Sequence, residues 1–327
     1  MATNEQYYRD FREHLQALEQ RSKLVRIRRE INKDTELMPL VRWQFRGLDE
    51  NQRKAFMFEN VVDGKGKRYE MPVTVGTLAA TTEIYAIGMM CQPDEIAERW
   101  TQAQLHPVDP VTVNTGPAQE VVGRGQELLN GRGLDMIPVP ISTPGFDNAP
   151  YLTSANWITK DPDTGIYNIG NYRSQIKASD RAGGFFMSQH MGQHWRKCKA
   201  KGKPLEAAIA IGVSPNIAYA ATAKIPYDFD EYRLAGGLAG APVEIVQAKT
   251  VDLLVPATAE IVIEGKISTE WIEPEGPFGE YPGYMGHRGI APFMEVSCIT
   301  HRREPIYTAL MSQFPPSESS KIKHTGT

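Results

Sequence analysis

Apolar residues recur with helical spacing near the amino terminus and then alternate with polar ones. Phe11, Leu15 and Leu18 lie at i, i+4 and i+7 within residues 8–21, which predicts an amphipathic opening helix. Residues 24–28 alternate apolar and basic side chains, as a half-buried strand does. Further signals predict a helix start at 34–37, strands at 55–58 and 73–75, and a helix from 93 to about 100. The first hundred or so residues therefore predict a mixed α/β fold.

Proline and glycine are enriched between residues 104 and 150, which indicates a domain boundary near residue 120. Beyond it, residues 151–159 and 166–176 are β-rich, and Asp161-Pro162-Asp163-Thr164-Gly165 between them predicts a hairpin turn. Further strands are predicted at 207–213, 243–247, 261–264 and 294–300, and a helix start at Ser214-Pro215. We expect an α/β amino-terminal domain over 1–120, a β-rich domain of the α+β class over 121–315, and a short polar segment over 316–327.

Length, charge and cysteine content narrow the class of protein. The chain has 327 residues, a length that suggests two domains. Its 36 Lys and Arg against 39 Asp and Glu give a net charge of −3 with no block of five or more like charges, which argues against nucleic acid because phosphate binding needs a basic face. No apolar stretch approaches the ~20 residues that span a bilayer, and residues 1–6 show no targeting signal. The three widely spaced cysteines favour a reducing compartment. We therefore expect a soluble cytoplasmic protein that binds neither nucleic acid nor membranes.

Three local patterns could carry chemistry, whereas generic nucleotide-binding motifs are absent from the sequence. The first is Asn168-Ile169-Gly170-Asn171-Tyr172-Arg173, on the second strand of the predicted hairpin. Strand alternation predicts its even-numbered residues on one face and its odd-numbered residues on the other, unless a bulge at Gly170 intervenes. The alternative interpretation is an exposed polar strand face.

The second pattern is the pair His190 and His194, whose spacing places both imidazoles on one face of a helix. The Glu of an HExxH motif is absent, so a zinc protease is not indicated. His190 beside hard oxygen donors would instead suit manganese or magnesium. The alternative is a pair of surface or capping histidines.

The third pattern places Glu275 and Glu280 within residues 273–284, where three prolines and three glycines exclude a helix. A tight loop can hold two carboxylates at fixed positions, and burial with a neighbouring arginine can keep one charged and make the other a proton donor. The alternative is a solvated acidic turn.

Taken together and in this order, the patterns resemble the UbiD family of reversible decarboxylases. The resemblance extends from the opening helix to residue 327. It rests on Asn168 and Arg173 five residues apart, Gln189-His190, Asp230-Glu231-Tyr232 after Ile225-Pro226, residues 252–260, and Glu275-Gly276-Pro277-Phe278-Gly279-Glu280.

The resemblance implies prenylated FMN, bound through a divalent cation, usually Mn²⁺, with K⁺ close by. Carried over by position, the metal ligands are Asn168, His190 and Glu231. A carboxylate, an amide oxygen and an imidazole leave positions open for phosphate oxygen and water, which suits a hard octahedral cation. The residues expected to line the cofactor are Gly170, Asn171, Tyr172, Arg173, Gln189, His190, Ala221, Thr222 and Ala223.

The resemblance also implies a catalytic set of Arg173, Glu275 and Glu280. In such enzymes an adduct between the modified flavin and the substrate loses CO₂, and an acid then protonates the remaining carbon. Glu280 is the expected acid, while Arg173 and Glu275 form an ion pair that orients the substrate carboxylate. The implied substrate is an aromatic or α,β-unsaturated carboxylic acid, and a flavin prenyltransferase is the implied source of the cofactor.

In fold terms the resemblance implies an α/β amino-terminal domain and a split β-barrel that holds the flavin. Family members continue into a carboxy-terminal domain that contributes a phosphate-binding lysine, part of the substrate pocket and the main dimer contact. We expect this domain to be missing from the 327-residue chain, and the complete protein to be a homo-oligomer. Two other functions stay open: a flavin-binding or assembly subunit without its own turnover, and a hydrolase that uses Glu275 and Glu280 as an acid/base pair.

Overall fold

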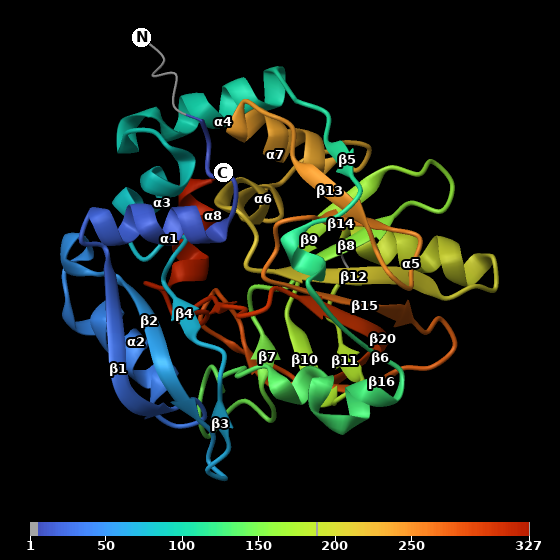
Figure 1. The fold of residues 1–327 in the computed structure, drawn as a ribbon, viewed down its shortest axis with the longest axis horizontal. Helices are drawn as coiled ribbons and strands as arrows, with labels where there is room; N and C mark the ends of the chain where they lie inside the picture. The colour runs from blue at the N-terminus through green and yellow to red at the C-terminus, as the bar shows by residue number, and fades with distance from the viewer. Residues whose placement is uncertain (1–5, 188, 327) are drawn as a thin grey trace.

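The computed structural model describes residues 6–187 and 189–326 (Figure 1). The expectation about a targeting signal concerns residues 1–6, and residues 1–5 lie outside the described ranges. The fold mixes helices with a curled antiparallel half-barrel sheet, as the resemblance implies. The helices are α1 (Phe11–Gln20), α2 (Leu37–Gly47), α3 (Thr82–Met89), α4 (Ile96–Leu105), α5 (His190–Ala200), α6 (Pro215–Ala220), α7 (Glu231–Ala239) and α8 (Glu318–Thr325).

The amino-terminal elements follow the hydrophobic pattern. Asp10 caps α1 by accepting a hydrogen bond from the backbone N–H of Glu13, and the helix buries Phe11, Leu15 and Leu18. The sheet beside it has the order β1-β2-β4-β21, with β3 paired to β2. Its strands are β1 (Leu24–Asn32), β2 (Ala55–Val62), β3 (Arg68–Tyr69), β4 (Val73–Val75) and β21 (Tyr307–Ala309). The strand β21, from late in the chain, pairs in parallel with β4.

The second large sheet is antiparallel and has the order β7-β10-β11-β20-β15-β12-β8-β9, with β6 paired to β20. Its strands are β6 (Val121–Arg124), β7 (Tyr151–Leu152), β8 (Asn156–Lys160), β9 (Tyr167–Asn171), β10 (Ser174–Ala178), β11 (Arg181–Gly183), β12 (Leu205–Ile211), β15 (Ile261–Ile267) and β20 (Phe293–His301). A third sheet joins β5 (Val111–Val113), β13 (Glu244–Gln247) and β14 (Leu254–Pro256). Figure 1 shows the two large sheets on opposite sides of the molecule.

The hairpin between β8 and β9 forms as predicted. Asp161 and Gly165 close the turn through backbone hydrogen bonds, and Gly165 has a φ of +76°. The pairing between the two strands runs without a shift from Lys160–Tyr167 to Asn156–Asn171, so there is no bulge at Gly170. Each predicted β-rich run is nevertheless two strands, because the chain leaves the sheet at 153–155 and again at 172–173.

The polar segment at the end of the described chain is a helix rather than a tail. In α8 the side chain of Glu318 is completely buried. Its carboxylate accepts hydrogen bonds from the backbone N–H groups of Gly76, Leu78, Ala79 and Met311, at 3.0 to 3.3 Å. Glu318 therefore ties α8 to the loop after β4.

Replacing Glu318 with alanine should lower the free energy of unfolding by roughly 3 kcal/mol or more, because buried N–H groups would lose their acceptor. Urea denaturation of this variant and of a Glu270→Ala control, which changes an exposed carboxylate, measures the difference. Equal midpoints for the two variants would contradict the anchoring role of Glu318.

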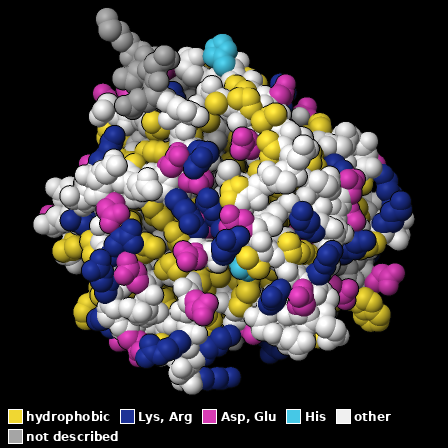
Figure 2. All heavy atoms as spheres, in the orientation of Figure 1, with side chains coloured by type: hydrophobic (Ala, Val, Ile, Leu, Met, Phe, Trp, Pro, Cys, Tyr) yellow, Lys and Arg dark blue, Asp and Glu magenta, His cyan; other side chains and the backbone are white. Residues whose placement is uncertain are grey.

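Acidic and basic side chains intermingle over the face shown in Figure 2. Among residues 6–187 and 189–326, no helix has both the length and the apolar character needed to cross a bilayer. Cys198 and Cys298 are buried, Cys91 is partly exposed, and all three are free thiols.

Candidate active site

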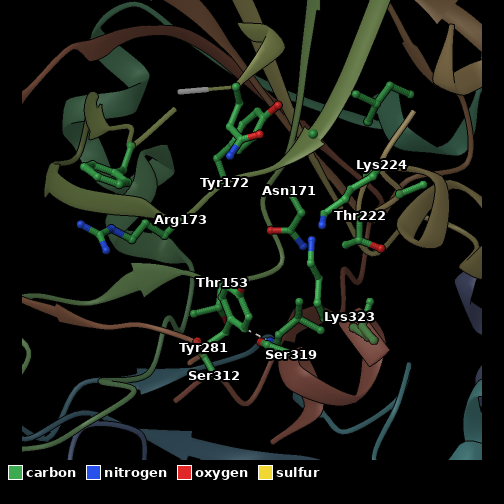
Figure 3. A pocket seen from close by; sticks show the side chains of 18 of the residues that line it. Thr153, Asn171, Tyr172, Arg173, Thr222, Lys224, Tyr281, Ser312, Ser319 and Lys323 are labelled. Atoms are coloured by element: carbon green, nitrogen blue, oxygen red, sulfur yellow. Dashed lines mark hydrogen bonds between the residues drawn. The ribbon is translucent and has the colours of Figure 1, made fainter. Parts of the chain in front are cut away.

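An open pocket of about 480 Å³ lies where β9, the start of α5, the segment after α6, the 278–281 loop and α8 meet. Its volume falls in the ~300–1,000 Å³ range of small-molecule sites. Figure 3 shows side chains from these elements directed into it. The pocket is lined by Thr153, residues 168–173, Phe185, Gln189, His190, residues 221–225, Glu231, Phe278, Glu280, Tyr281, Leu310, Ser312, Ser319, Ile322 and Lys323.

Arg173 stands at one side of the pocket and contacts two carboxylates. Its Nε and Nη2 donate to the two carboxylate oxygens of Glu275, at 2.9 and 2.6 Å. Its Nη1 forms an ion pair with Glu280. The Arg173 and Glu275 side chains are 8% and 3% exposed, whereas Glu280 is 34% exposed. Glu280 is therefore the carboxylate that a ligand in the pocket can reach.

The loop that carries the two carboxylates is folded onto itself. It contains two short antiparallel strand pairs. The strand β16 (Glu273–Glu275) pairs with β19 (Gly289–Ala291), and β17 (Phe278–Gly279) pairs with β18 (Met285–Gly286). Gly276 has a φ of +83° between the carboxylates, and its N–H donates to Tyr151 Oη at 3.1 Å. A side chain at Gly286 would come within about 3.2 Å of both Arg173 Nη1 and Glu280 Oε1. The backbone thus encloses the charged cluster closely.

Two aromatic rings complete the arginine environment. The guanidinium carbon of Arg173 lies 4.2 Å from the ring centroid of Phe185 and 5.3 Å from that of Phe278. These contacts exclude water on the faces of the guanidinium and favour its charge through the ring quadrupoles. Phe185 carries no sequence signal for this role, since it lies outside every motif identified above.

Asn168, His190 and Glu231 line the same pocket from β9, α5 and α7. Glu231 is 4% exposed, and one of its oxygens accepts from the Ile169 N–H at 2.9 Å. Burial raises the pKa of Glu231 to about 8 and lowers that of His190. Within the described residues, Asn168 Nδ2 is buried without a hydrogen-bond partner. An amide can turn over to present its oxygen instead.

A hydrogen-bonded group holds His190 in place from behind. The ring of Tyr227 packs edge-on against His190, with centroids 5.3 Å apart. The Tyr227 hydroxyl donates to Asp161 Oδ2 at 2.5 Å, and Lys197 donates to the same oxygen at 2.6 Å. His194, which is 2% exposed, hydrogen-bonds through Nδ1 with Thr159 Oγ1 at 2.9 Å. The hairpin thereby contacts α5 at His194 and Lys197, and Tyr227 links its turn to the ring of His190.

The structure gathers the residues of the expected catalytic, cofactor-lining and metal-binding sets. Every one of them lines the pocket except Glu275, which contacts Arg173 from behind it. His194, the second histidine of the pair, does not line the pocket. Burial argues against the alternative interpretations at three residues: Asn168 lies in no exposed strand face, His194 is not a surface histidine, and Glu275 is not solvated.

The regular pairing keeps the predicted alternation along β9 as far as Asn171, although all of residues 168–173 line the pocket. Tyr172 and Arg173 belong to the connection between β9 and β10, where the alternation does not apply.

The comparisons with known proteins agree with this architecture. Residues 15–104 match the model of the 3-octaprenyl-4-hydroxybenzoate carboxy-lyase N-terminal domain, and residues 110–315 match that of the Rift-related domain of the same enzymes. An uncharacterized protein of Synechocystis is 33% identical over 96% of this chain, which spans 65% of that relative. The chain thus covers just under two thirds of its length.

Two solved structures are similar over nearly the whole chain. The UbiD-class enzyme HmfF from Pelotomaculum thermopropionicum, in complex with FMN, has a TM-score of 0.86 and 35% identity, over 97% of this chain and 67% of that one. An evolved dimeric form of HmfF in complex with prenylated FMN has a TM-score of 0.84 and 34% identity, over 98% and 70%. The chain is a member of the UbiD family of decarboxylases.

Proposed function

We propose that this chain forms the flavin-binding core of a reversible decarboxylase that acts on an aromatic or α,β-unsaturated carboxylic acid. Its cofactor is prenylated FMN, held through Mn²⁺ with K⁺ close by, and a flavin prenyltransferase supplies it. One observation carries the proposal: a single pocket joins the donors Asn168, His190 and Glu231 to the cluster of Arg173, Glu275 and Glu280. The complete protein is proposed to be a homo-oligomer.

The donor set fits a hard divalent cation. No cluster of three His, Cys, Asp or Glu side chains with a metal-binding arrangement occurs in residues 6–187 and 189–326, so this site would depend on the amide of Asn168. Glu231 is a buried carboxyl group that accepts from the backbone N–H of Ile169, and a cation would favour its charged form. The lowered pKa of His190 keeps its imidazole neutral, the form that binds metals. These three side chains would hold the cation, and the cation would in turn bind the flavin phosphate.

The chain's other groups would manage the substrate and the proton. When bound, prenylated FMN supplies the electron sink for the electron pair left by departing CO₂. Arg173 presents a fixed, aromatic-flanked guanidinium to the substrate carboxylate. Glu275 keeps that guanidinium oriented through two hydrogen bonds. Glu280, accessible from the pocket, would deliver the proton to the carbon that loses CO₂.

The hydrolase alternative has no support in this geometry. A pair of acid/base carboxylates needs both groups at the substrate. Both oxygens of Glu275 are occupied by Arg173, and Glu275 does not line the pocket.

The proposal is tested by coexpressing the chain with a flavin prenyltransferase, then recording its absorbance spectrum and metal content. Release of CO₂ from a panel of aromatic and unsaturated acids is measured on the same preparation. Bound flavin and Mn²⁺ with CO₂ release support the decarboxylase. Bound flavin without turnover of any acid would favour the flavin-binding subunit, and a protein free of flavin and metal would overturn both.

Glu231→Ala should act through cofactor occupancy. Removing the carboxylate deletes the only negative ligand proposed for the cation, so we expect Mn²⁺ and flavin per chain to fall at least ~10-fold. Metal analysis and flavin absorbance measure this, with Glu244→Ala on β13 as an exposed control. Unchanged Mn²⁺ content in Glu231→Ala would remove Glu231 from the ligand set.

A further inference from the structure

Two side chains near β7 contact the loop that carries Glu275 and Glu280. Asp147 lies shortly before β7, and Tyr151 is the first residue of that strand. Neither side chain is among those that line the pocket. We propose that both are positioning residues. Asp147 fixes the backbone beside Glu280, and Tyr151 fixes the backbone beside the other glutamate. This inference rests on the proposed function, which gives the two glutamates their roles.

Asp147 binds the backbone of the residue that precedes Glu280. Its Oδ1 accepts from the N–H of Gly279 at 3.2 Å and from Nε2 of Gln313 at 3.3 Å. Its Oδ2 accepts from the N–H of Thr143 at 2.6 Å. All three donors are electrically neutral, and together they use both carboxylate oxygens. Because Gly279 directly precedes Glu280, its hydrogen bond to Asp147 restrains the position from which the Glu280 side chain extends.

The side chain of Gln313 supports this contact from the other side of Gly279. Gln313 is 2% exposed and has a φ of +74°, a left-handed conformation that a residue other than glycine keeps only where its surroundings require it. Its Oε1 accepts from Thr143 Oγ1, and from Arg42 Nη2 at 3.4 Å. A Cβ atom at Gly279 would overlap the Gln313 side chain. Asp147 and Gln313 thus form a hydrogen-bonded support directly against the backbone of Gly279.

Tyr151 reaches the same loop next to Glu275. The side chain is 1% exposed, and its Oη accepts from the N–H of Gly276 at 3.1 Å. Its ring lies against that of Phe278, with centroids 4.4 Å apart. Burial and the charge of Glu275 raise the pKa of Tyr151, so the phenol keeps its proton. That proton is donated to Asn148 Oδ1 at 3.3 Å, which leaves a lone pair of the oxygen for Gly276.

The two contacts act on different groups, so their effects should be separable. Loss of the Asp147 carboxylate would displace Glu280, the proposed proton donor, and should lower kcat. Loss of the Tyr151 hydroxyl would displace Glu275, which orients Arg173 toward the substrate carboxylate, and should raise KM. A loss of stability alone would lower the flavin content of the protein and leave both constants, taken per bound flavin, unchanged.

The first test measures kcat and KM for CO₂ release per bound flavin, in the complete enzyme with the acid of the panel that the wild type converts fastest. Asp147→Ala should lower kcat about 10-fold or more and change KM less than about 2-fold, since a misplacement of ~1 Å can cost ~10²-fold. Asp147→Asn keeps one acceptor oxygen and should recover part of this loss. Asp94→Ala, which changes an exposed carboxylate, is the control.

Tyr151→Phe keeps the ring contact with Phe278 and removes only the hydroxyl. We expect its KM to rise about 10-fold, the effect of one lost hydrogen bond, with little change in kcat. If Asp147→Ala and Tyr151→Phe both kept the kcat and KM of the wild type, the assignment would be overturned. It would also be overturned if the two variants changed both constants by the same factors.

Amide hydrogen exchange in the 327-residue chain gives a readout that needs no turnover. The amides of residues 276–280 should exchange at least ~10-fold faster in Asp147→Ala and in Tyr151→Phe, while those of α1 keep their rates. Unchanged exchange at 276–280 in both variants would overturn the assignment. Failure of the proposed function looks different: the wild type would release CO₂ from no acid, while faster exchange in the two variants would still support the two contacts.

Discussion

Replacing Glu280 with glutamine should lower turnover per bound flavin by roughly 10² to 10⁴-fold, the usual effect of losing a general acid. The amide keeps the size of the side chain and can still contact Arg173, but it has no proton to deliver. Because Glu280 is not among the donors proposed for the cation, flavin and metal content should change little. The measurement is CO₂ release divided by flavin absorbance, in the complete enzyme with its substrate.

A second readout separates proton delivery from binding. The wild type should exchange the hydrogen at the protonated carbon of the product for deuterium from D₂O, a reaction that needs no CO₂, and Glu280→Gln should slow this exchange as much as turnover. Glu270→Gln, an exposed carboxylate near the same loop, serves as the control. If Glu280→Gln kept near wild-type turnover, the proton would come from another group, and the role proposed for Glu280 would be wrong.

Short-range features of the fold are predictable from this sequence because they depend on neighbouring residues. The spacing of Phe11, Leu15 and Leu18 fixes the buried face of α1, and the sequence of the 161–165 turn fixes the hairpin. Pairing of β21 with β4 joins residues more than two hundred positions apart, and no local pattern encodes it. The helix α8 was missed for a related reason. Its polar sequence suggests a tail, whereas the stabilising partners of Glu318 are backbone N–H groups from distant segments.

The site shows the same division between local and distant information. Asn168, Arg173, His190, Glu231 and the two loop glutamates were found because their order along the chain matches a family motif. Physical patterns alone placed none of them in one pocket, since the elements that carry them are not adjacent in sequence. Phe185 was missed because it belongs to no motif; its contact with Arg173 depends on how the segment before α5 packs.

Replacing Arg173 with alanine should reduce turnover more than Glu280→Gln does, beyond the ~10⁴-fold loss of a general acid alone. The change removes the partner of the substrate carboxylate. It also leaves Glu275, 3% exposed, as a buried carboxylate without a counterion, which costs about 3–5 kcal/mol. We therefore expect a lower free energy of unfolding as well as lost activity. Denaturation and CO₂ release are measured on the same preparation.

A double variant distinguishes the catalytic effect of Arg173 from this destabilisation. Arg173→Ala leaves the charge of Glu275 buried without a counterion, and Glu275→Gln removes that charge. The double variant Arg173→Ala/Glu275→Gln should therefore recover much of the lost stability. Turnover should not recover with it, because no cation then faces the substrate carboxylate. Arg173→Lys keeps the charge but cannot form both hydrogen bonds to Glu275, and it should give intermediate turnover. If the double variant regained turnover along with stability, Arg173 would serve only to neutralise Glu275.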